Sequence, residues 1–144
     1  MALGELPIRV YFQDTDSGGI VFHAAYLDFF ERGRTEWLRT LGITQGGLYN
    51  ELGLMFVVRK IDIRYLKPAF LDELLLVKTE ISRIGKAQIT ICQKVLRDKG
   101  LLMKGTVNLG FISAGDLRPK VIPDWMRDKL ILQSAPLSGD IKDT

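Results

Sequence analysis

The chain has 144 residues and a formal net charge of +3, from 20 basic and 17 acidic residues. This length fits one domain with an ordinary hydrophobic core, and no block of like charges is long enough to indicate a nucleic-acid-binding arm. Cys92 has no second cysteine to pair with, so the fold does not depend on an oxidising compartment.

No segment of the sequence indicates export or membrane insertion. The N-terminus lacks the basic start and apolar run of a signal peptide, and no apolar stretch approaches the roughly 20 residues of a membrane helix. We therefore expect a soluble cytoplasmic protein. We also expect one domain over residues 1–133 and a polar, flexible tail over residues 134–144.

The first two predicted elements are a strand and a long helix. Ile8, Val10 and Phe12 alternate with Arg9 and Tyr11, which predicts a half-buried strand that includes Phe12. The period then becomes helical, over a segment that starts at His23 and ends near Leu41. The residues on its core side are Phe22, Tyr26, Phe29, Phe30, Gly33, Trp37 and Leu41.

Four further strands follow a glycine-rich connection over residues 42–53. The period-two pattern places them at residues 56–66, 74–84, 87–97 and about 103–111, with a hairpin turn at residues 98–100. Pro123 suits the first turn of a short terminal helix.

The order of these elements decides the fold class. Parallel strands need crossover helices, and none lies between the four later strands. The sequence therefore predicts an α+β fold, in which a curved antiparallel sheet of about five strands wraps its apolar face around the long helix. The outer face and edges of such a sheet need cover, which self-association would supply.

The residues that carry chemistry lie between Val10 and Tyr26. Two aspartates, Asp14 and Asp16, precede a pair of glycines, and the only histidine, His23, stands where the helix is expected to begin. This brings a carboxylate, an imidazole and the electropositive end of a helix together within a short segment.

Two metal-dependent interpretations fit this segment poorly. Asp14 and Asp16 have the spacing of the first two ligands of a calcium-binding loop. The fifth and twelfth positions of such a loop need side-chain oxygen ligands, but here they are Gly18 and Ala25. An Asp-x-Asp pair also opens some phosphatases, which need a parallel sheet and a magnesium site completed further along the chain. We therefore expect no metal ion and no cofactor.

Hydrolysis of a thioester accounts for more of the segment. Attack on the carbonyl group creates an oxyanion, which the free amides at a helix N-terminus can stabilise. Glycines allow the backbone to approach a ligand closely. A carboxylate nearby can act as a general base on water, or as a nucleophile through a transient anhydride.

Four stretches, at residues 14–26, 30–38, 56–60 and 65–69, carry a resemblance to a known family. The first reads Asp14-Thr15-Asp16-Ser17-Gly18-Gly19-Ile20-Val21-Phe22-His23-Ala24-Ala25-Tyr26. The chain resembles the hotdog-fold acyl-CoA thioesterases of the 4-hydroxybenzoyl-CoA thioesterase-like family, and within it the bacterial branch linked to the Tol-Pal envelope system. The similarity covers roughly residues 7–125.

The resemblance implies a hotdog fold and an acyl-CoA thioesterase with Asp16 as the catalytic carboxylate. It places the amide that polarises the thioester carbonyl at His23, whose side chain is also implicated. It further implies a dimer joined edge to edge, often paired again into a tetramer, with the acyl group bound between subunits. The predicted substrate-binding residues are Gly19, Tyr26, Val58, Arg59 and Lys60.

Some residues have simpler interpretations or depart from the family pattern. Asp14 is expected to be a turn or capping residue, and Phe12 stands where relatives often have a tyrosine. Gly33 replaces a common helix alanine, and we interpret it as a packing feature. Arg83 and Lys86, like Arg59 and Lys60, are candidates to contact the phosphates of coenzyme A.

Two rival functions remain open at this stage. A hotdog hydratase or dehydratase would act on hydroxyacyl thioesters, although the Asp14-Thr15-Asp16 loop argues against it. A non-catalytic scaffold that binds acyl groups or acyl carrier protein would show ligand binding without thiol release. The sequence does not decide the acyl chain, the choice between coenzyme A and a carrier protein, or dimer against tetramer.

Overall fold

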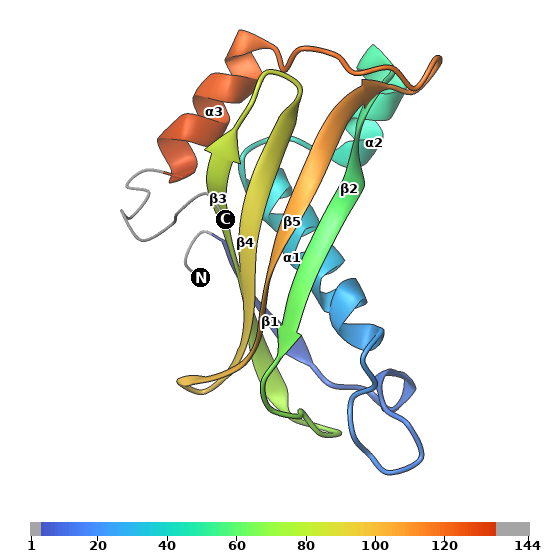
Figure 1. The fold of residues 1–144 in the computed structure, drawn as a ribbon, viewed down its shortest axis with the longest axis vertical. Coiled ribbons are helices and arrows are strands. Elements are labelled where there is room, and N and C mark those ends of the chain that lie inside the picture. The colour runs from blue at the N-terminus through green and yellow to red at the C-terminus, as the bar shows by residue number, and fades with distance from the viewer. Residues whose placement is uncertain (1–3, 135–144) are drawn as a thin grey trace.

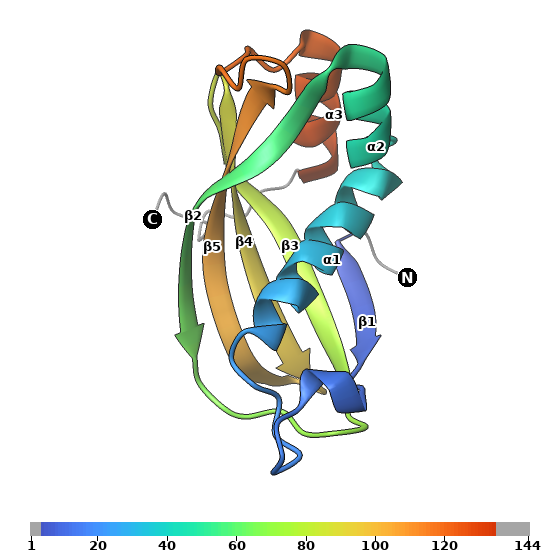
Figure 2. The same cartoon turned by 90° about the vertical axis from the view of Figure 1, so that its right-hand side faces the viewer.

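The computed structural model describes residues 4–134, which form a curved five-stranded sheet with one long helix against one face (Figure 1, Figure 2). The strands are β1 (Glu5–Arg9), β2 (Leu54–Tyr65), β3 (Leu74–Ile84), β4 (Gln88–Arg97) and β5 (Gly100–Ser113). The helices are η1 (Phe12–Asp14), α1 (Ala25–Thr40), α2 (Gln45–Gly47), η2 (Leu48–Leu52) and α3 (Asp124–Ser134).

The sheet is antiparallel throughout, in the order β1-β3-β4-β5-β2. In Figure 1 its outer face is towards the viewer and α1 lies behind it, and the side view in Figure 2 shows the two layers. The predicted α+β layer architecture is therefore confirmed. The hairpin turn at residues 98–100 and the terminal helix after Pro123 are also as predicted.

Two predicted boundaries near the N-terminus are wrong. The first strand ends at Arg9, and Phe12 begins the short helix η1, where its side chain is 79% exposed. The long helix starts at Ala25 rather than His23, and Phe22 lies outside it with a partly exposed ring. The chain turns early because the Asp14 carboxylate accepts a hydrogen bond from the Tyr11 amide, 2.9 Å away.

Among residues 4–134, no helix is both long enough and apolar enough to cross a membrane. The predicted tail lies outside the described residues, apart from Ser134 at the end of α3.

The core fills the space between α1 and the inner face of the sheet. Tyr26, Phe29, Phe30 and Trp37 are buried on the helix, as the helical period predicts. The inner face of the sheet opposes them with the alternate residues of the central strands, Leu75, Val77, Ile81, Ile89, Ile91, Val95, Met103, Val107, Leu109 and Phe111. Burial of these side chains supplies the main force that holds helix to sheet.

The middle of α1 approaches the sheet at Gly33. A Cβ atom at this position would lie 2.7 Å from Cγ1 of Val77 and 3.1 Å from both Nε2 of Gln93 and Oγ1 of Thr79. Only a residue without a side chain allows this distance between helix and sheet. The prediction that Gly33 is a packing feature is therefore confirmed.

A buried hydrogen-bond network surrounds this contact. Gln93 donates from Nε2 to the Phe30 carbonyl at 2.9 Å and to the Thr79 hydroxyl at 3.0 Å. Its Oε1 accepts from the Arg34 guanidinium at 3.1 Å, and burial lowers the pKa of Arg34 from its ordinary value. Because an unpaired buried polar group is costly, the network favours one rotation and one height of the helix on the sheet.

Replacement of Gly33 by alanine should destabilise the fold. The added methyl group overpacks the contact at a cost of roughly 1–3 kcal/mol, against a helix-propensity gain of about 1 kcal/mol. We expect chemical denaturation to show a net loss of up to about 2 kcal/mol in the free energy of unfolding. The control is Gly46→Ala, where the new methyl group meets nothing within 4 Å. An equal effect in both variants would contradict this account of Gly33.

Candidate active site

The segment between η1 and α1 folds into a small hairpin that hangs beyond the end of the sheet (Figure 2). Thr15 and Val21 form an antiparallel bridge, and the Asp16 amide donates to the Ile20 carbonyl at 3.0 Å. The Gly19 amide donates a hydrogen bond to the Asp16 carbonyl at 3.1 Å, and the backbone φ of Gly19 is +77°. Glycine adopts this left-handed conformation without strain, which is why it closes the turn.

The Asp16 carboxylate is held by the turn that it begins. Its Oδ1 accepts hydrogen bonds from the amides of Gly18 at 2.9 Å and Ile20 at 3.4 Å, and the side chain is exposed. Its Oδ2 accepts no hydrogen bond from the described residues. One oxygen therefore fixes the orientation of the carboxylate, and the other is available to a water molecule or a substrate.

Asp14 has a different task. Its side chain is only 5% exposed, and Oδ2 accepts the hydrogen bond from the Tyr11 amide. Its backbone carbonyl also accepts from the Phe22 amide at 3.2 Å, which ties the two ends of the hairpin. The prediction that Asp14 is a turn or capping residue is confirmed.

The start of α1 presents two amides beside this loop. Ala24 is the capping residue and its side chain provides no cap. Within residues 4–134, the His23 and Ala24 amides donate no hydrogen bond, as expected for the first turn of a helix. The His23 side chain is exposed.

The peptide groups that carry the His23 and Ala24 amides are both fixed through their carbonyl oxygens. The Phe22 carbonyl accepts from the Ala25 amide at 3.0 Å, and the His23 carbonyl accepts from the Tyr65 hydroxyl at 3.0 Å. A hydrogen bond at the carbonyl of a peptide group polarises the N–H on its other side. The amides of His23 and Ala24 are therefore well suited to hold an anion.

Tyr65 is the residue that sequence reasoning missed. Its ring packs edge-on against the Tyr26 ring, with centroids 5.5 Å apart. Its hydroxyl donates a hydrogen bond to the carbonyl of His23, 42 residues earlier in the sequence. The Tyr26 hydroxyl accepts from the Ala69 amide at 3.2 Å, and burial raises the pKa of Tyr26. Tyr65 lies within one of the stretches that carry the family resemblance, but spacing alone gives no sign of its partner.

Apolar side chains surround the candidate site. Ile20, Phe22, Leu27, Tyr65 and Phe70 are each partly exposed in the single chain, and Ile20 bridges to Phe70. A group of exposed apolar side chains on a small domain marks a binding surface for a ligand or for another chain.

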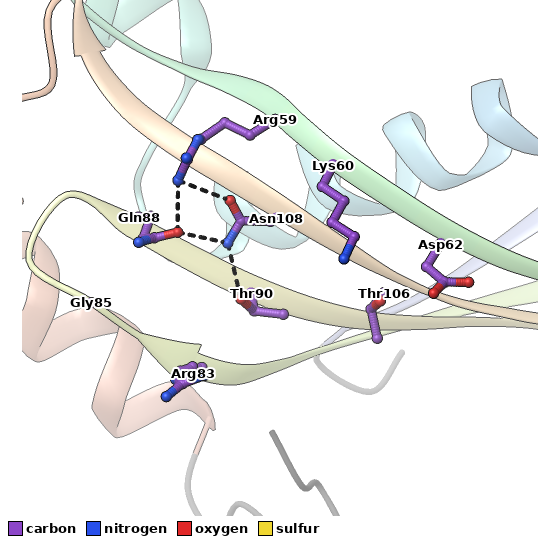
Figure 3. A pocket seen from close by; sticks show the side chains of 9 residues that line it. All are labelled: Arg59, Lys60, Asp62, Arg83, Gly85, Gln88, Thr90, Thr106 and Asn108. Carbon is purple, nitrogen blue, oxygen red and sulfur yellow. Dashed lines mark hydrogen bonds between the residues drawn. The ribbon is translucent and has the colours of Figure 1, made fainter. Parts of the chain in front are cut away.

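The predicted substrate-binding residues fall into separate places. Gly19 lies in the hairpin, whereas the Tyr26 side chain is buried in the core. Val58 is half-exposed and shares the inner face with its pairing partner, Leu109. Arg59 occupies a β-bulge and, together with Lys60, lines the opposite face (Figure 3). Tyr65 lies five positions along the strand from Lys60, about 17 Å away, so one chain does not bring the predicted substrate-binding residues together.

Comparisons with known proteins decide the family. The family model described as "Thioesterase superfamily" matches residues 18–104. The chain belongs to the thioesterase superfamily. The prediction of a thioester hydrolase is therefore confirmed at the level of the family.

Two curated thioesterases match most of the chain. The acyl-CoA thioesterase YbgC of Haemophilus influenzae is 47% identical over 117 residues, which is 81% of this chain and 86% of that protein. The acyl-CoA thioester hydrolase YbgC of Escherichia coli is 37% identical over 118 residues, covering 81% and 87%.

A solved structure gives the same result for the fold. A probable thioesterase from Bartonella henselae superposes with a TM-score of 0.80 at 38% sequence identity, covering 85% of this chain and 100% of that one. The hotdog fold of this thioesterase is therefore as predicted.

The two aspartates of the thioesterase loop should respond differently to truncation. Asp14→Ala leaves the Tyr11 amide without its partner, and we expect a loss of about 1–2 kcal/mol in the free energy of unfolding. Asp16→Ala should change this free energy by less than about 0.5 kcal/mol, because water replaces an exposed acceptor. Thermal and chemical denaturation measure both. Equal losses would show that the loop depends on both carboxylates.

Proposed function

We propose that this thioesterase hydrolyses an acyl-CoA thioester to the free carboxylic acid and coenzyme A. The observation that carries the proposal is the exposed Asp16 carboxylate, held by its own turn, in the hairpin that leads into two helix-start amides without a hydrogen bond in the described chain. The names of the similar YbgC proteins support the choice of acyl-CoA as substrate.

The reaction proceeds in two steps at one carbonyl carbon. A water molecule attacks the thioester while Asp16 Oδ2 takes its proton, and the carbonyl oxygen becomes an oxyanion held by the amides of His23 and Ala24. The carbon–sulfur bond then breaks, and the thiolate of coenzyme A leaves and takes up a proton. Asp16 can also act as the nucleophile, through an acyl-aspartyl anhydride that water hydrolyses.

The His23 imidazole is the second catalytic side chain of the proposal. It is exposed at the start of α1, where it can orient the attacking water or give a proton to the departing thiolate. These tasks are separate from that of the His23 backbone amide, which remains after any substitution of the side chain except proline.

The acyl group binds between subunits of a homodimer or homotetramer in this proposal. β2 stands at an edge of the sheet, and its outer edge pairs with no strand of the described chain. A second copy joined there would bring a partner's β2, including its Val58, towards the hairpin of the first. The enzyme works in the cytoplasm, and a carrier-protein thioester is an alternative form of its substrate.

Asp16→Asn should abolish hydrolysis and leave the fold intact. Asparagine retains an oxygen for the Gly18 amide but cannot take a proton from water, so we expect kcat/KM for acyl-CoA to fall about a hundredfold or more. Thiol release measures the activity, and the thermal midpoint checks the fold. Full activity in this variant would refute the proposed role of Asp16.

Tyr65→Phe should lower kcat about tenfold with little change in KM. The phenylalanine ring still packs on Tyr26, but the peptide group between His23 and Ala24 loses the hydrogen bond that orients it. The matched control is Tyr49→Phe, since the Tyr49 side chain is exposed and makes no hydrogen bond within residues 4–134. A rise in KM at unchanged kcat would instead show that Tyr65 only binds substrate.

A further inference from the structure

The hairpin of the candidate active site is attached to the connection between β2 and β3, residues 66–73. The Val21 amide donates a hydrogen bond to the Ala69 carbonyl at 2.9 Å, and the Leu71 amide donates one to the Gly19 carbonyl at 3.0 Å. In Figure 2 this β2–β3 connection runs beside the hairpin at the lower end of the sheet. The hairpin and the connection therefore form a small antiparallel unit of their own.

This unit contains the partner of Asp16 across the hairpin. Ile20 bridges to Phe70 of the β2–β3 connection, and on its other side it accepts from the Asp16 amide at 3.0 Å and donates to the Asp16 carboxylate at 3.4 Å. In the part of the chain that the structure describes, the other backbone hydrogen bonds of residues 15–22 stay inside the stretch 11–25. The place of the β2–β3 connection therefore helps to set the place of Asp16.

An ion pair holds the β2–β3 connection on both sides. Glu73 accepts the Phe70 amide with Oε1 at 2.8 Å. Arg97, the last residue of β4, donates from Nη1 to the two carboxylate oxygens of Glu73 at 2.9 and 3.2 Å, and to the Pro68 carbonyl at 3.2 Å. One guanidinium group thus joins the two ends of the connection, and the Glu73 carboxylate links it to Phe70, which bridges to Ile20.

The Glu73–Arg97 pair is less open to water than the ion pair on α1. The side chains of Arg97 and Glu73 are 32% and 26% exposed, whereas those of Arg39 and Glu36 are 56% and 47% exposed. A partly buried pair is screened less by salt than an exposed one. Its several hydrogen bonds also define one geometry, so the pair can hold the connection in one position.

The sheet itself does not depend on this pair. The register of β3 with β4 begins at Leu76 and Leu96, beyond both Glu73 and Arg97. Arg97 pairs with Gly100 of β5 through its backbone, and its side chain takes no part in that ladder. Loss of the pair should therefore loosen the β2–β3 connection and leave the strands in place.

We propose that the Glu73–Arg97 pair is a positioning pair for thioester hydrolysis, which fixes the place of the Asp16 carboxylate relative to the helix-start amides. This inference rests on the proposed function. The pair touches neither Asp16 nor the substrate site and acts through the bridge of Phe70 to Ile20. A displacement of about 1 Å at a catalytic group can lower a rate about a hundredfold. Asp16 is exposed, so its neighbours in the hairpin, rather than surrounding core, must limit its movement.

Removal of one charge at a time tests the pair in the full-length enzyme. Glu73→Gln retains an oxygen for the Phe70 amide, and Arg97→Gln removes the guanidinium group. We expect each change to lower kcat for acyl-CoA about tenfold, with KM altered less than about twofold. The double variant should lose no more than either single variant, because the two side chains act as one unit. The control is Glu36→Gln, which breaks the exposed pair on α1 and should leave kcat unchanged.

Amide hydrogen exchange gives a readout that does not need catalysis. In Glu73→Gln, the Val21 and Leu71 amides should exchange about tenfold faster than in wild type, because local opening of the hairpin becomes easier. The amides at the centre of β4 should exchange as before. The thermal midpoint should fall by less than about 4 °C, since a single partly exposed ion pair contributes little to the stability of the whole fold.

Three results would overturn the positioning pair. They are an unchanged kcat in both single variants, a rise in KM at unchanged kcat, and exchange at Val21 and Leu71 that is either unchanged or faster only to the same extent as throughout the sheet. Wild-type enzyme that releases no thiol would refute the proposed function instead. The exchange rates of the Val21 and Leu71 amides would then still decide whether the pair holds the hairpin.

Discussion

The close approach of α1 to the sheet at Gly33 is the constraint on which the rest of the structure depends. A methyl group there would collide with Val77, and the buried Gln93 network fixes the helix around that point. This contact fixes the middle of the helix, and the hydrogen bond from the Tyr65 hydroxyl to the His23 carbonyl holds its start. Two contacts, one at the middle and one at the start, together set the direction of the helix-start amides.

The loop before the helix divides its chemistry between two aspartates. Asp14 is buried and binds backbone, so it builds the loop, whereas Asp16 is exposed and anchored through one oxygen only. Because Asp16 is exposed, we attribute its reactivity to its position rather than to burial. Gly18 and Gly19 form the turn that sets this position, and glycine does so with little backbone strain. In the proposed dimer, the surrounding apolar side chains would then be covered by the second subunit and the acyl group.

Sequence patterns predicted the parts of this molecule that repeat regularly. Residues 74–84 alternate and form a strand with the predicted bounds, and the spacing of the loop, with the family resemblance, selected Asp16. Phe12 was misplaced because the Asp14 carboxylate bends the chain, and hydrophobic period does not record a local polar contact. Two further features could not be predicted from the pattern. Arg59 faces outward because of a β-bulge, and the hydrogen bond of Tyr65 to His23 joins segments that are far apart in the sequence.

The central claim is that this site breaks a thioester bond rather than only holding an acyl group. The most direct test is thiol release by the purified wild-type protein over a panel of short, long and aromatic acyl-CoA substrates, with the free acid measured in parallel. The account predicts saturable release of coenzyme A in equal amount to free acid for at least one class. Tight binding of acyl-CoA without any thiol release across the panel would contradict it and would favour a scaffold.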